Sequence, residues 1–405
     1  MKRILKVFLG VVSLALMVLS LPAADWTQFR GPGGTGVSAE TNLPVKWGKA
    51  EGLRYKVELP GRGLSNPVIA DGRVFVTACS GYRETRLHVL CFEEATGKKL
   101  WERQSTATGN TACHQMTCMA APTPATDGKA VYALFATGDL VAYDRAGTLL
   151  WYRSLVGDYP NITNQVGMAS SVVLAGKSLL VPMENAGDSF IAGVDTVTGK
   201  NLWRMKRSKT ISWVTPVVGE TGGRPVAIFP MPGNITAVEP TTGKVRWILE
   251  GGAVSTIVSP SFGDGVLYSP GDGGLTALKP GNDGSPPREL WKGENFGSGY
   301  ASPVYQGGRV YGLGSVNVKC VSAADGKEVW TQRIDGPFSA SPVIAGGRLY
   351  AVNNKGRTTV LELGDEPKVL AKNDLDDTIL ATPAVANGCI YLRSDKYLYC
   401  VGSKK

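Results

Sequence analysis

Two cysteines, a histidine and two methionines crowd one short stretch of the chain, which reads GNTACHQMTCMAAP at residues 109–122. These side chains suggest a metal site. Cu(I) prefers sulfur ligands, and the stretch supplies Cys113, Met116, Cys118 and Met119. The competing interpretation is a loop stapled by a disulfide. The choice between them depends on where the fold places the stretch.

The spacing argues against most metal and catalytic interpretations. Zinc would take Cys113, His114 and Cys118, but no fourth ligand is evident and adjacent side chains chelate one ion poorly. A c-type haem needs C-x-x-C-H, which does not occur. A catalytic Cys113–His114 pair lacks a third group to orient the imidazole. We therefore expect a Cys113–Cys118 disulfide and no metal ion, because six residues make a closable loop.

The first 24 residues have the pattern of a signal peptide. A basic start is followed by an apolar run from Val7 to Leu21 and by small residues before Asp25. The run is short for a membrane span, so we expect cleavage near Ala24. No cysteine follows the run, so we expect no lipid anchor. We predict a periplasmic or secreted protein, with an uncleaved anchor helix as the alternative.

Seven cysteines in an exported chain are compatible with disulfides and leave at least one thiol unpaired. Cys389 and Cys400 flank the stretch CIYLRSDKYLYC, two alternating runs about a Ser-Asp turn. Pairing Arg393 with Lys396 puts Cys389 directly opposite Cys400, where a cross-strand bridge is geometrically possible. This pair is the second predicted disulfide.

Composition and charge narrow the class of protein. With 43% hydrophobic residues the chain can build a core, and its 51 glycines and 24 prolines favour short strands joined by tight turns. The formal net charge is +9, but Lys and Arg form no basic run. We therefore expect an all-β protein that does not bind nucleic acid.

A repeat runs through the chain and is clearest in SASPVIAGGRLYAV and YASPVYQGGRVYGL. Each unit has Ser or Thr, Pro and Val, then a glycine turn and an alternating strand, and later a Thr-Gly-Lys or Asp-Gly-Lys turn before a strand with Trp. Glycine supplies the positive φ of tight hairpin turns, so each unit reads as four antiparallel strands, A to D. Eight strand A markers occur, at Pro67, Pro122, Ser171, Pro216, Pro260, Pro303, Pro342 and Pro383. Six units carry the strand D tryptophan, at Trp101, Trp151, Trp203, Trp247, Trp291 and Trp330.

The two ends of the chain complement each other. The eighth unit stops after strand C, and Tyr55 lies twelve residues before Pro67, just as Trp330 lies twelve before Pro342. Tyr55 therefore belongs to an orphan strand D. Pairing it with the C-terminal strands predicts one closed, eight-bladed β-propeller over residues 25–405. Separate β-sandwiches would not explain this complementarity.

The signatures TGK..W and SPV...GGRVY resemble the repeat of PQQ-like β-propellers over nearly all of the mature chain. That family includes quinoprotein dehydrogenases and BamB, a component of the bacterial outer-membrane protein assembly machinery. The resemblance implies that the tryptophans pack between blades. The dehydrogenases stack their quinone against a disulfide between consecutive cysteines and add an acidic calcium site. No two cysteines are consecutive in this chain, so we expect neither enzyme activity nor a cofactor; a divergent oxidoreductase using PQQ with calcium is the alternative.

Long loops should gather on one face, which carries the B to C and D to A connections. The D to A connections after blades 1 and 2, and the B to C loops of blades 1 and 3, are the long ones. Functional residues concentrate on such loops. A ring at the channel mouth is expected three residues before each strand A marker, at Leu64, Met119, Met168, Trp213, Ile257, Tyr300, Ser339 and Leu380. The candidate binding residues are Arg83, Arg86, His114, Met119, Asn164, Gln165, Met168, Glu184, Asn185, Asp188, Trp213 and Tyr300.

These observations predict a monomeric, non-catalytic binding or scaffold module, similar to BamB, that holds a protein or other macromolecule against the elaborated face of blades 1–3. Recognition of carbohydrate through Trp213 and Tyr300 is a further alternative.

Overall fold

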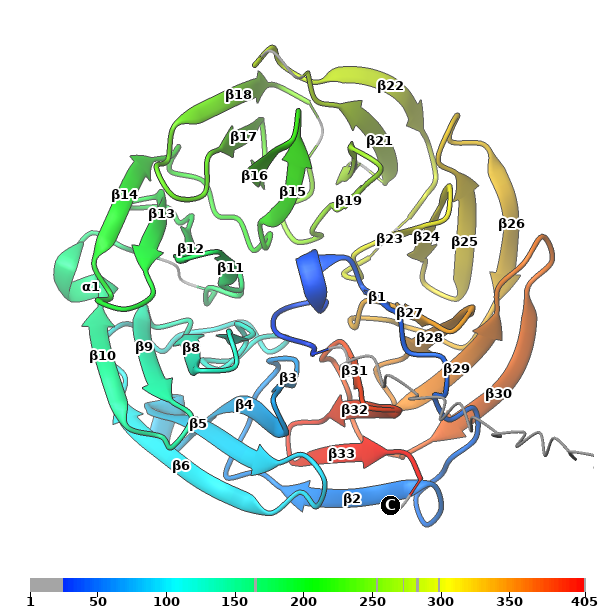
Figure 1. Cartoon of the computed structure of the whole chain (residues 1–405), viewed down its shortest axis with the longest axis horizontal. Helices are drawn as coiled ribbons and strands as arrows, with labels where there is room; N and C mark the ends of the chain where they lie inside the picture. Colours follow the sequence, from blue (N-terminus) through cyan, green and yellow to red (C-terminus); the bar gives the residue numbers. More distant parts are fainter. Residues whose placement is uncertain are drawn as a thin grey trace, which may run out of the picture.

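Eight β-sheets stand around a central channel (Figure 1). The computed structural model describes residues 25–163, 166–252, 254–271, 273–281, 284–297 and 299–403. The predicted signal peptide lies outside these ranges. Within them, no helix is long and apolar enough to cross a membrane.

Each blade has four antiparallel strands, which are named below from the channel outwards. Blade 1 is β3 (Val68–Ala70), β4 (Arg73–Ser80), β5 (Arg86–Glu93) and β6 (Lys99–Thr106); blade 2 is β7 (Ala125–Thr126), β8 (Ala130–Leu134), β9 (Asp139–Asp144) and β10 (Leu149–Ser154). Blade 3 is β11 (Val173–Ala175), β12 (Ser178–Met183), β13 (Phe190–Asp195) and β14 (Asn201–Lys206); blade 4 is β15 (Val217–Thr221), β16 (Arg224–Met231), β17 (Asn234–Val238) and β18 (Val245–Glu250). Blade 5 is β19 (Ser261–Gly263), β20 (Val266–Gly271), β21 (Gly274–Lys279) and β22 (Arg288–Gly293); blade 6 is β23 (Val304–Gln306), β24 (Arg309–Leu313), β25 (Asn317–Ser322) and β26 (Glu328–Arg333). Blade 7 is β27 (Val343–Ala345), β28 (Arg348–Val352), β29 (Arg357–Glu362) and β30 (Lys368–Asp374); blade 8 is β31 (Ala384–Ala386), β32 (Cys389–Arg393), β33 (Tyr397–Val401) and β2 (Leu53–Glu58). The remaining elements are β1 (Val37–Ser38), the 3-10 turns η1 (Pro32–Gly34) and η2 (Tyr82–Glu84), and the one-turn helix α1 (Leu155–Asp158).

The predicted closure of the ring is confirmed. Strand β2 pairs antiparallel with β33, and Tyr55 lies opposite Cys400. The first and last parts of the chain thus share one blade (Figure 1). The N-terminal strand therefore completes blade 8, which closes the ring of blades beside blade 1.

The tryptophans pack between blades, as the resemblance implies. The Trp203 indole donates a hydrogen bond to the Pro240 carbonyl of the next blade at 2.8 Å. Gly243 of that blade has a φ of 69°, and a Cβ there would lie 2.6 Å from the Trp203 ring. The same relation recurs between Trp101 and Gly147, Trp151 and Gly199, and Trp291 and Gly326. The Thr-Gly-Lys turn and the Trp of the repeat are therefore two halves of one contact between neighbouring blades.

A closed ring of hydrogen bonds explains the Ser or Thr at the start of each unit. One residue precedes the inner strand of each blade, and its backbone N–H donates to the side-chain oxygen of the residue at the same position in the next blade. Ser259 donates in this way to Ser302 at 3.1 Å, and Ser302 donates to Ser341 at 3.0 Å. The Thr382 N–H closes the ring on the Asn66 side chain at 3.0 Å. The eight members are Asn66, Thr123, Ser171, Thr215, Ser259, Ser302, Ser341 and Thr382. All eight are buried, so the ring satisfies donors that would otherwise be orphaned at the channel wall.

The segment 25–38 fills the centre of the ring, where Figure 1 shows η1. Trp26 exchanges two 2.8 Å backbone hydrogen bonds with Ile69 of blade 1, and β1 pairs in parallel with β27 of blade 7. Between them the fully buried Arg30 donates to the carbonyls of Pro260, at 2.9 Å, and Pro303. Desolvation lowers the pKa of Arg30 to about 9. This plug, which the repeat pattern did not predict, contacts blades on both sides of the channel.

Candidate functional site

An apolar cavity of about 280 Å³ opens at the mouth of the channel. Five successive D to A connections build it, from the one after β6 to the one after β22. They carry the lining residues His114, Met116, Thr117, Val166, Ala169, Trp213, Ile257 and Tyr300. The side chains of Tyr300 and Ile257 remain 49% and 37% exposed. Large apolar side chains left open to solvent in a concave site are typical of binding surfaces.

Hydrogen bonds hold the walls of this cavity. The Trp213 indole donates to the Gly167 carbonyl at 2.6 Å, and the Trp213 backbone N–H donates to Thr256 at 2.8 Å. The His114 backbone N–H donates to the Val166 carbonyl at 3.1 Å. Because these bonds connect neighbouring D to A connections, the cavity has a preorganised shape.

The four long loops form one continuous belt, as their common face predicts. The Met119 N–H donates to the Glu84 carboxylate of η2 at 2.9 Å, which ties the B to C loop of blade 1 to the next connection. The Asp188 N–H donates to the Asn161 carbonyl at 2.9 Å, which ties the B to C loop of blade 3 to the connection after blade 2. The His114–Val166 bond links the two halves.

The prediction that Met119 and Met168 lie at the channel mouth is wrong. Both are buried in the core under the belt. The hydrogen-bond ring shows why, because it aligns Thr123 of blade 2 with Ser341, so that the equivalent of Pro342 is Pro124 and not Pro122. In blade 3 the same alignment moves the predicted marker by one residue and brings Ala169 to the mouth. Trp213, Ile257 and Tyr300 stand where the repeat predicts.

The predicted polar candidates divide into rim residues and structural residues. Arg83 of η2 and Arg86 at the start of β5 are exposed, and Asp188 is half-buried. Glu184 and Asn185 are buried. The Glu184 carboxylate accepts from Arg207 at 2.8 Å, and the Asn185 amide bonds backbone groups of its own loop and the Thr163 N–H of the connection after blade 2. Burial raises the pKa of Glu184, which Arg207 opposes. Asn164 and Gln165 lie outside the described residues.

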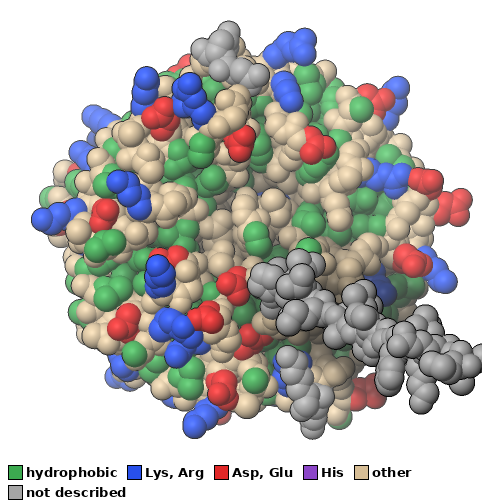
Figure 2. All heavy atoms as spheres, in the orientation of Figure 1, with side chains coloured by type: hydrophobic (Ala, Val, Ile, Leu, Met, Phe, Trp, Pro, Cys, Tyr) green, Lys and Arg blue, Asp and Glu red, His purple; other side chains and the backbone are tan. Residues whose placement is uncertain are grey.

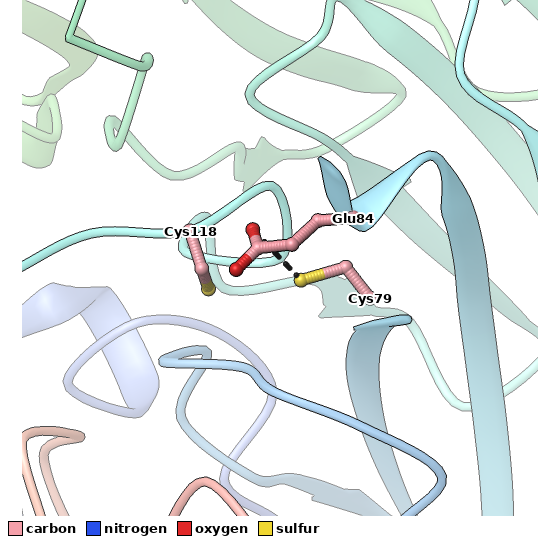
Figure 3. A group of neighbouring side chains, drawn as sticks. All are labelled: Cys79, Glu84 and Cys118. Atoms are coloured by element: carbon pink, nitrogen blue, oxygen red, sulfur yellow. Dashed lines mark hydrogen bonds between the residues drawn. The ribbon is translucent and has the colours of Figure 1, made fainter. Parts of the chain in front are cut away.

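The expected Cys113–Cys118 disulfide is absent from this structure. All seven cysteines lie in the described ranges, and none forms a disulfide. Cys113 Sγ lies 3.8 Å from the Thr117 carbonyl. Cys118 instead lies beside Cys79 of β4 and Glu84 of η2. The two sulfur atoms and a carboxylate oxygen of Glu84 all lie within 4.8 Å of one another (Figure 3). Sequence reasoning missed this cluster because Cys79 belongs to a different strand of the preceding blade.

The second predicted disulfide rested on the wrong hairpin register. Arg393 pairs with Leu398 rather than Lys396, so Tyr391, and not Cys389, lies opposite Cys400. The hydroxyl of Ser394 accepts hydrogen bonds from the backbone N–H groups of Lys396 and Tyr397, and thereby moves the turn by one residue. Cys389 and Cys400 are therefore diagonal neighbours on paired strands. The interaction with Cys389 raises the pKa of Cys400, and burial adds to this effect.

Two guanidinium groups flank the Cys79–Glu84–Cys118 cluster. Arg62 lies 3.8 Å from the Glu84 carboxylate and donates to the Thr117 carbonyl at 2.8 Å. Arg393 is fully buried and donates to Ser65 at 2.7 Å, while its Nη2 has no hydrogen-bond partner among the described residues. Positive charge at this position opposes a bound cation. The cluster supplies three ligands, which is one short of a closed tetrahedral site.

His88 lies in β5, and both of its ring nitrogens are hydrogen-bonded. The Ser80 hydroxyl lies 2.7 Å from Nε2 and the Glu102 carboxylate lies 2.8 Å from Nδ1. Desolvation lowers the pKa of His88, while Glu102 raises it. The order hydroxyl, imidazole and carboxylate is that of a nucleophile with its base, but His88 is buried and the arrangement satisfies its polar atoms within blade 1.

The sequence matches a protein family whose members have this kind of repeat. A family model with the description "Outer membrane protein assembly factor BamB" matches residues 31–186, 163–264 and 271–369. No curated protein matches the sequence.

Among solved structures, BamB from Moraxella catarrhalis is 16% identical with a TM-score of 0.64, over 86% of this chain and 97% of that one. Quinohemoprotein alcohol dehydrogenase from Comamonas testosteroni is 13% identical with a TM-score of 0.70, over 94% and 81%. The C-terminal WD40 domain of Sif2 is 15% identical with a TM-score of 0.60, over 86% and 97%. At these identities the likeness concerns the fold alone.

The family match covers most of the chain, including the glycine turns and tryptophans whose contacts join the blades. This protein therefore belongs to the PQQ-like β-propeller family of the outer membrane protein assembly factor BamB.

Proposed function

We propose that this protein is an exported, non-catalytic scaffold that binds a protein partner at its channel mouth. The observation that carries the proposal is the apolar cavity formed by five successive connections, with Tyr300 and Ile257 at its edge. The channel behind it is occupied by the plug, so an apolar side chain of a partner would enter a closed pocket rather than a passage. Arg83 and Arg86, which are exposed in and beside the B to C loop of blade 1, would contact polar groups of the partner outside that anchor.

The charge distribution supports protein binding over nucleic-acid binding. Cationic and anionic side chains are interspersed around the rim of the disc in the view of Figure 2. The described lining of the cavity contains His114 but no lysine or arginine. A nucleic-acid site would need a continuous cationic track.

Site-directed photocross-linking in the producing cell tests the proposal. A photoreactive amino acid in place of Tyr300 should yield a discrete protein adduct. Val197, 78% exposed in the turn between β13 and β14 on the opposite face, is the matched apolar control and should yield none. Equal labelling at both positions would contradict a specific site at the mouth.

A quinoprotein oxidoreductase is the second candidate, favoured by the extent of the fold match to the alcohol dehydrogenase. The described lining of the mouth cavity offers no carboxylate for calcium, and the nearby Glu184 is engaged by Arg207. PQQ fits this site poorly for that reason. Adding PQQ with calcium should leave the melting temperature and alcohol-dependent dye reduction at the level of buffer alone. Substrate-dependent turnover would replace the scaffold proposal.

A further inference from the structure

We propose that Cys79 and Cys118 become joined by a disulfide in the exported protein, fastening the connection between blades 1 and 2 to the side of blade 1. The bond rests on the proposed export, since an oxidising compartment is needed to keep it. It does not depend on a partner at the channel mouth.

The two sulfur atoms already face each other. The two sulfur atoms lie within 4.8 Å of one another, beside the Glu84 carboxylate that Cys79 contacts (Figure 3), and the interaction with Cys118 raises the pKa of Cys79. Both side chains are buried, with at most 1% exposed. One residue lies in the regular strand β4 and the other in a connection without strands, so rotation of the Cys118 side chain and small shifts of its loop can close the remaining gap.

The surroundings favour a disulfide over a metal ion. Arg62 and Arg393 place two positive charges beside the cluster, and both are within electrostatic range of Cys118. The Glu84 carboxylate is engaged by Cys79 at 3.3 Å and by the Met119 N–H at 2.9 Å. A neutral disulfide needs no compensating charge, whereas a divalent cation would be repelled by both guanidinium groups.

The Cys389–Cys400 pair differs in a way that provides an internal comparison. These residues are diagonal neighbours on paired strands, because Tyr391 lies opposite Cys400. Diagonal pairs have Cα atoms about 7–8 Å apart, beyond the span of about 4.4–6.8 Å that a disulfide requires. The regular ladder of β32 and β33 prevents either strand from moving closer. We expect this pair to stay reduced while Cys79 and Cys118 oxidise.

The chemistry is a two-step thiol–disulfide exchange with a disulfide oxidant. Glu84 accepts the Cys79 proton, and the Cys79 sulfur attacks the oxidant's S–S bond, releasing one reduced thiol. The Cys118 sulfur then displaces the second half of the oxidant as another thiol. The protein loses two hydrogens and the oxidant gains them. Because both sulfurs are buried once folded, the exchange takes place before the connection docks onto blade 1.

The bond would fix one wall of the mouth cavity. Thr117 and Met116 line the cavity and directly precede Cys118. A covalent anchor at Cys118 therefore holds both residues in place, which preorganises the cavity.

The full chain should be exported, denatured in the presence of an alkylating agent and digested without reduction. Trypsin releases Cys79 in residues 74–83 and both Cys113 and Cys118 in residues 104–129. The proposal predicts these two peptides joined, minus two hydrogens, with Cys389 and Cys400 alkylated. Because one peptide carries two cysteines, Cys113→Ser is the control: the linked species must persist in it and vanish in Cys118→Ser.

A second measurement keeps the test independent of export and of variant folding. Denatured wild-type chain is refolded either in a mixture of oxidised and reduced glutathione or with a reductant present throughout, and the melting temperature of each product is measured. The disulfide should raise it by about 5 °C. Alkylation of Cys79 and Cys118 as free thiols after both treatments would overturn the proposal. So would an internal Cys113–Cys118 bond, or a metal ion retained by wild type and lost in Cys118→Ser.

Discussion

Gly97 lies against the ring of Tyr55, so closely that a Cβ on the glycine would stand 2.6 Å from two ring atoms. Gly97 belongs to the last turn of blade 1, and Tyr55 belongs to the N-terminal strand that completes blade 8. The contact is the same one that Gly243 makes with Trp203 elsewhere in the ring. The blade assembled from both chain ends is thereby joined to its neighbour by the standard interface of the repeat.

Gly97→Ala should destabilise the protein more than a change of backbone preference alone. Gly97 and Gly72 have the same φ of 73°, but Gly72 has no atom within 4 Å of its Cβ position. Gly72→Ala should therefore report the cost of a positive φ, about 1 kcal/mol. Gly97→Ala should add about 1–3 kcal/mol for the clash with Tyr55. Urea unfolding of both variants measures the difference, and equal losses would mean that this interface is loosely packed.

Ser302→Ala should break one link of the hydrogen-bond ring. The buried Ser259 N–H loses its acceptor, which costs about 1–3 kcal/mol of unfolding free energy. Ser302→Thr is the matched control, because threonine fills the equivalent position in other blades, as at Thr215. Chemical denaturation should show near wild-type stability for the threonine variant. A loss as large as that of the alanine variant would contradict the ring's contribution.

His88 should make stability depend on pH. Burial lowers its folded pKa below the usual value of about 6.5, so the unfolded chain binds the extra proton. This contribution is complete above about pH 6.5 and is lost as the pH falls below it. His88→Gln should flatten the slope of unfolding free energy below about pH 6.5. A slope that His88→Gln leaves unchanged would show that His88 does not titrate in this range.

The architecture was predictable because the repeat encodes local contacts. Turn glycines, tryptophans and the Ser or Thr before each inner strand recur at fixed spacing, and their counts fixed both the number of blades and the pairing of Tyr55 with the C-terminal strands. The plug was not predictable, because residues 25–38 carry no copy of the repeat. Arg30 finds its partners in blades 5 and 6, more than 200 residues away in sequence.

The site was predictable only where the repeat stays regular. Trp213 and Tyr300 lie in D to A connections of the usual length, and both are at the channel mouth, where the repeat predicts them. Met119 does not lie there, because a long connection displaced the inner strand of blade 2 from the position that Pro122 suggested. Cys79 and Cys118 meet through a loop fold that no spacing rule describes.

Binding at the channel mouth is tested most directly by the affinity of a partner captured there. Purified partner should be titrated by calorimetry against wild type, Trp213→Ala, Tyr300→Ala and the opposite-face control Val197→Ala. Removing an aromatic anchor from an apolar pocket typically costs about 2 kcal/mol, or about thirtyfold in Kd. We expect that loss for both mouth variants and wild-type affinity for Val197→Ala. Tyr300→Ala should also keep the wild-type melting temperature, because Tyr300 is 49% exposed. Equal affinity for all four proteins would contradict a binding site at the mouth.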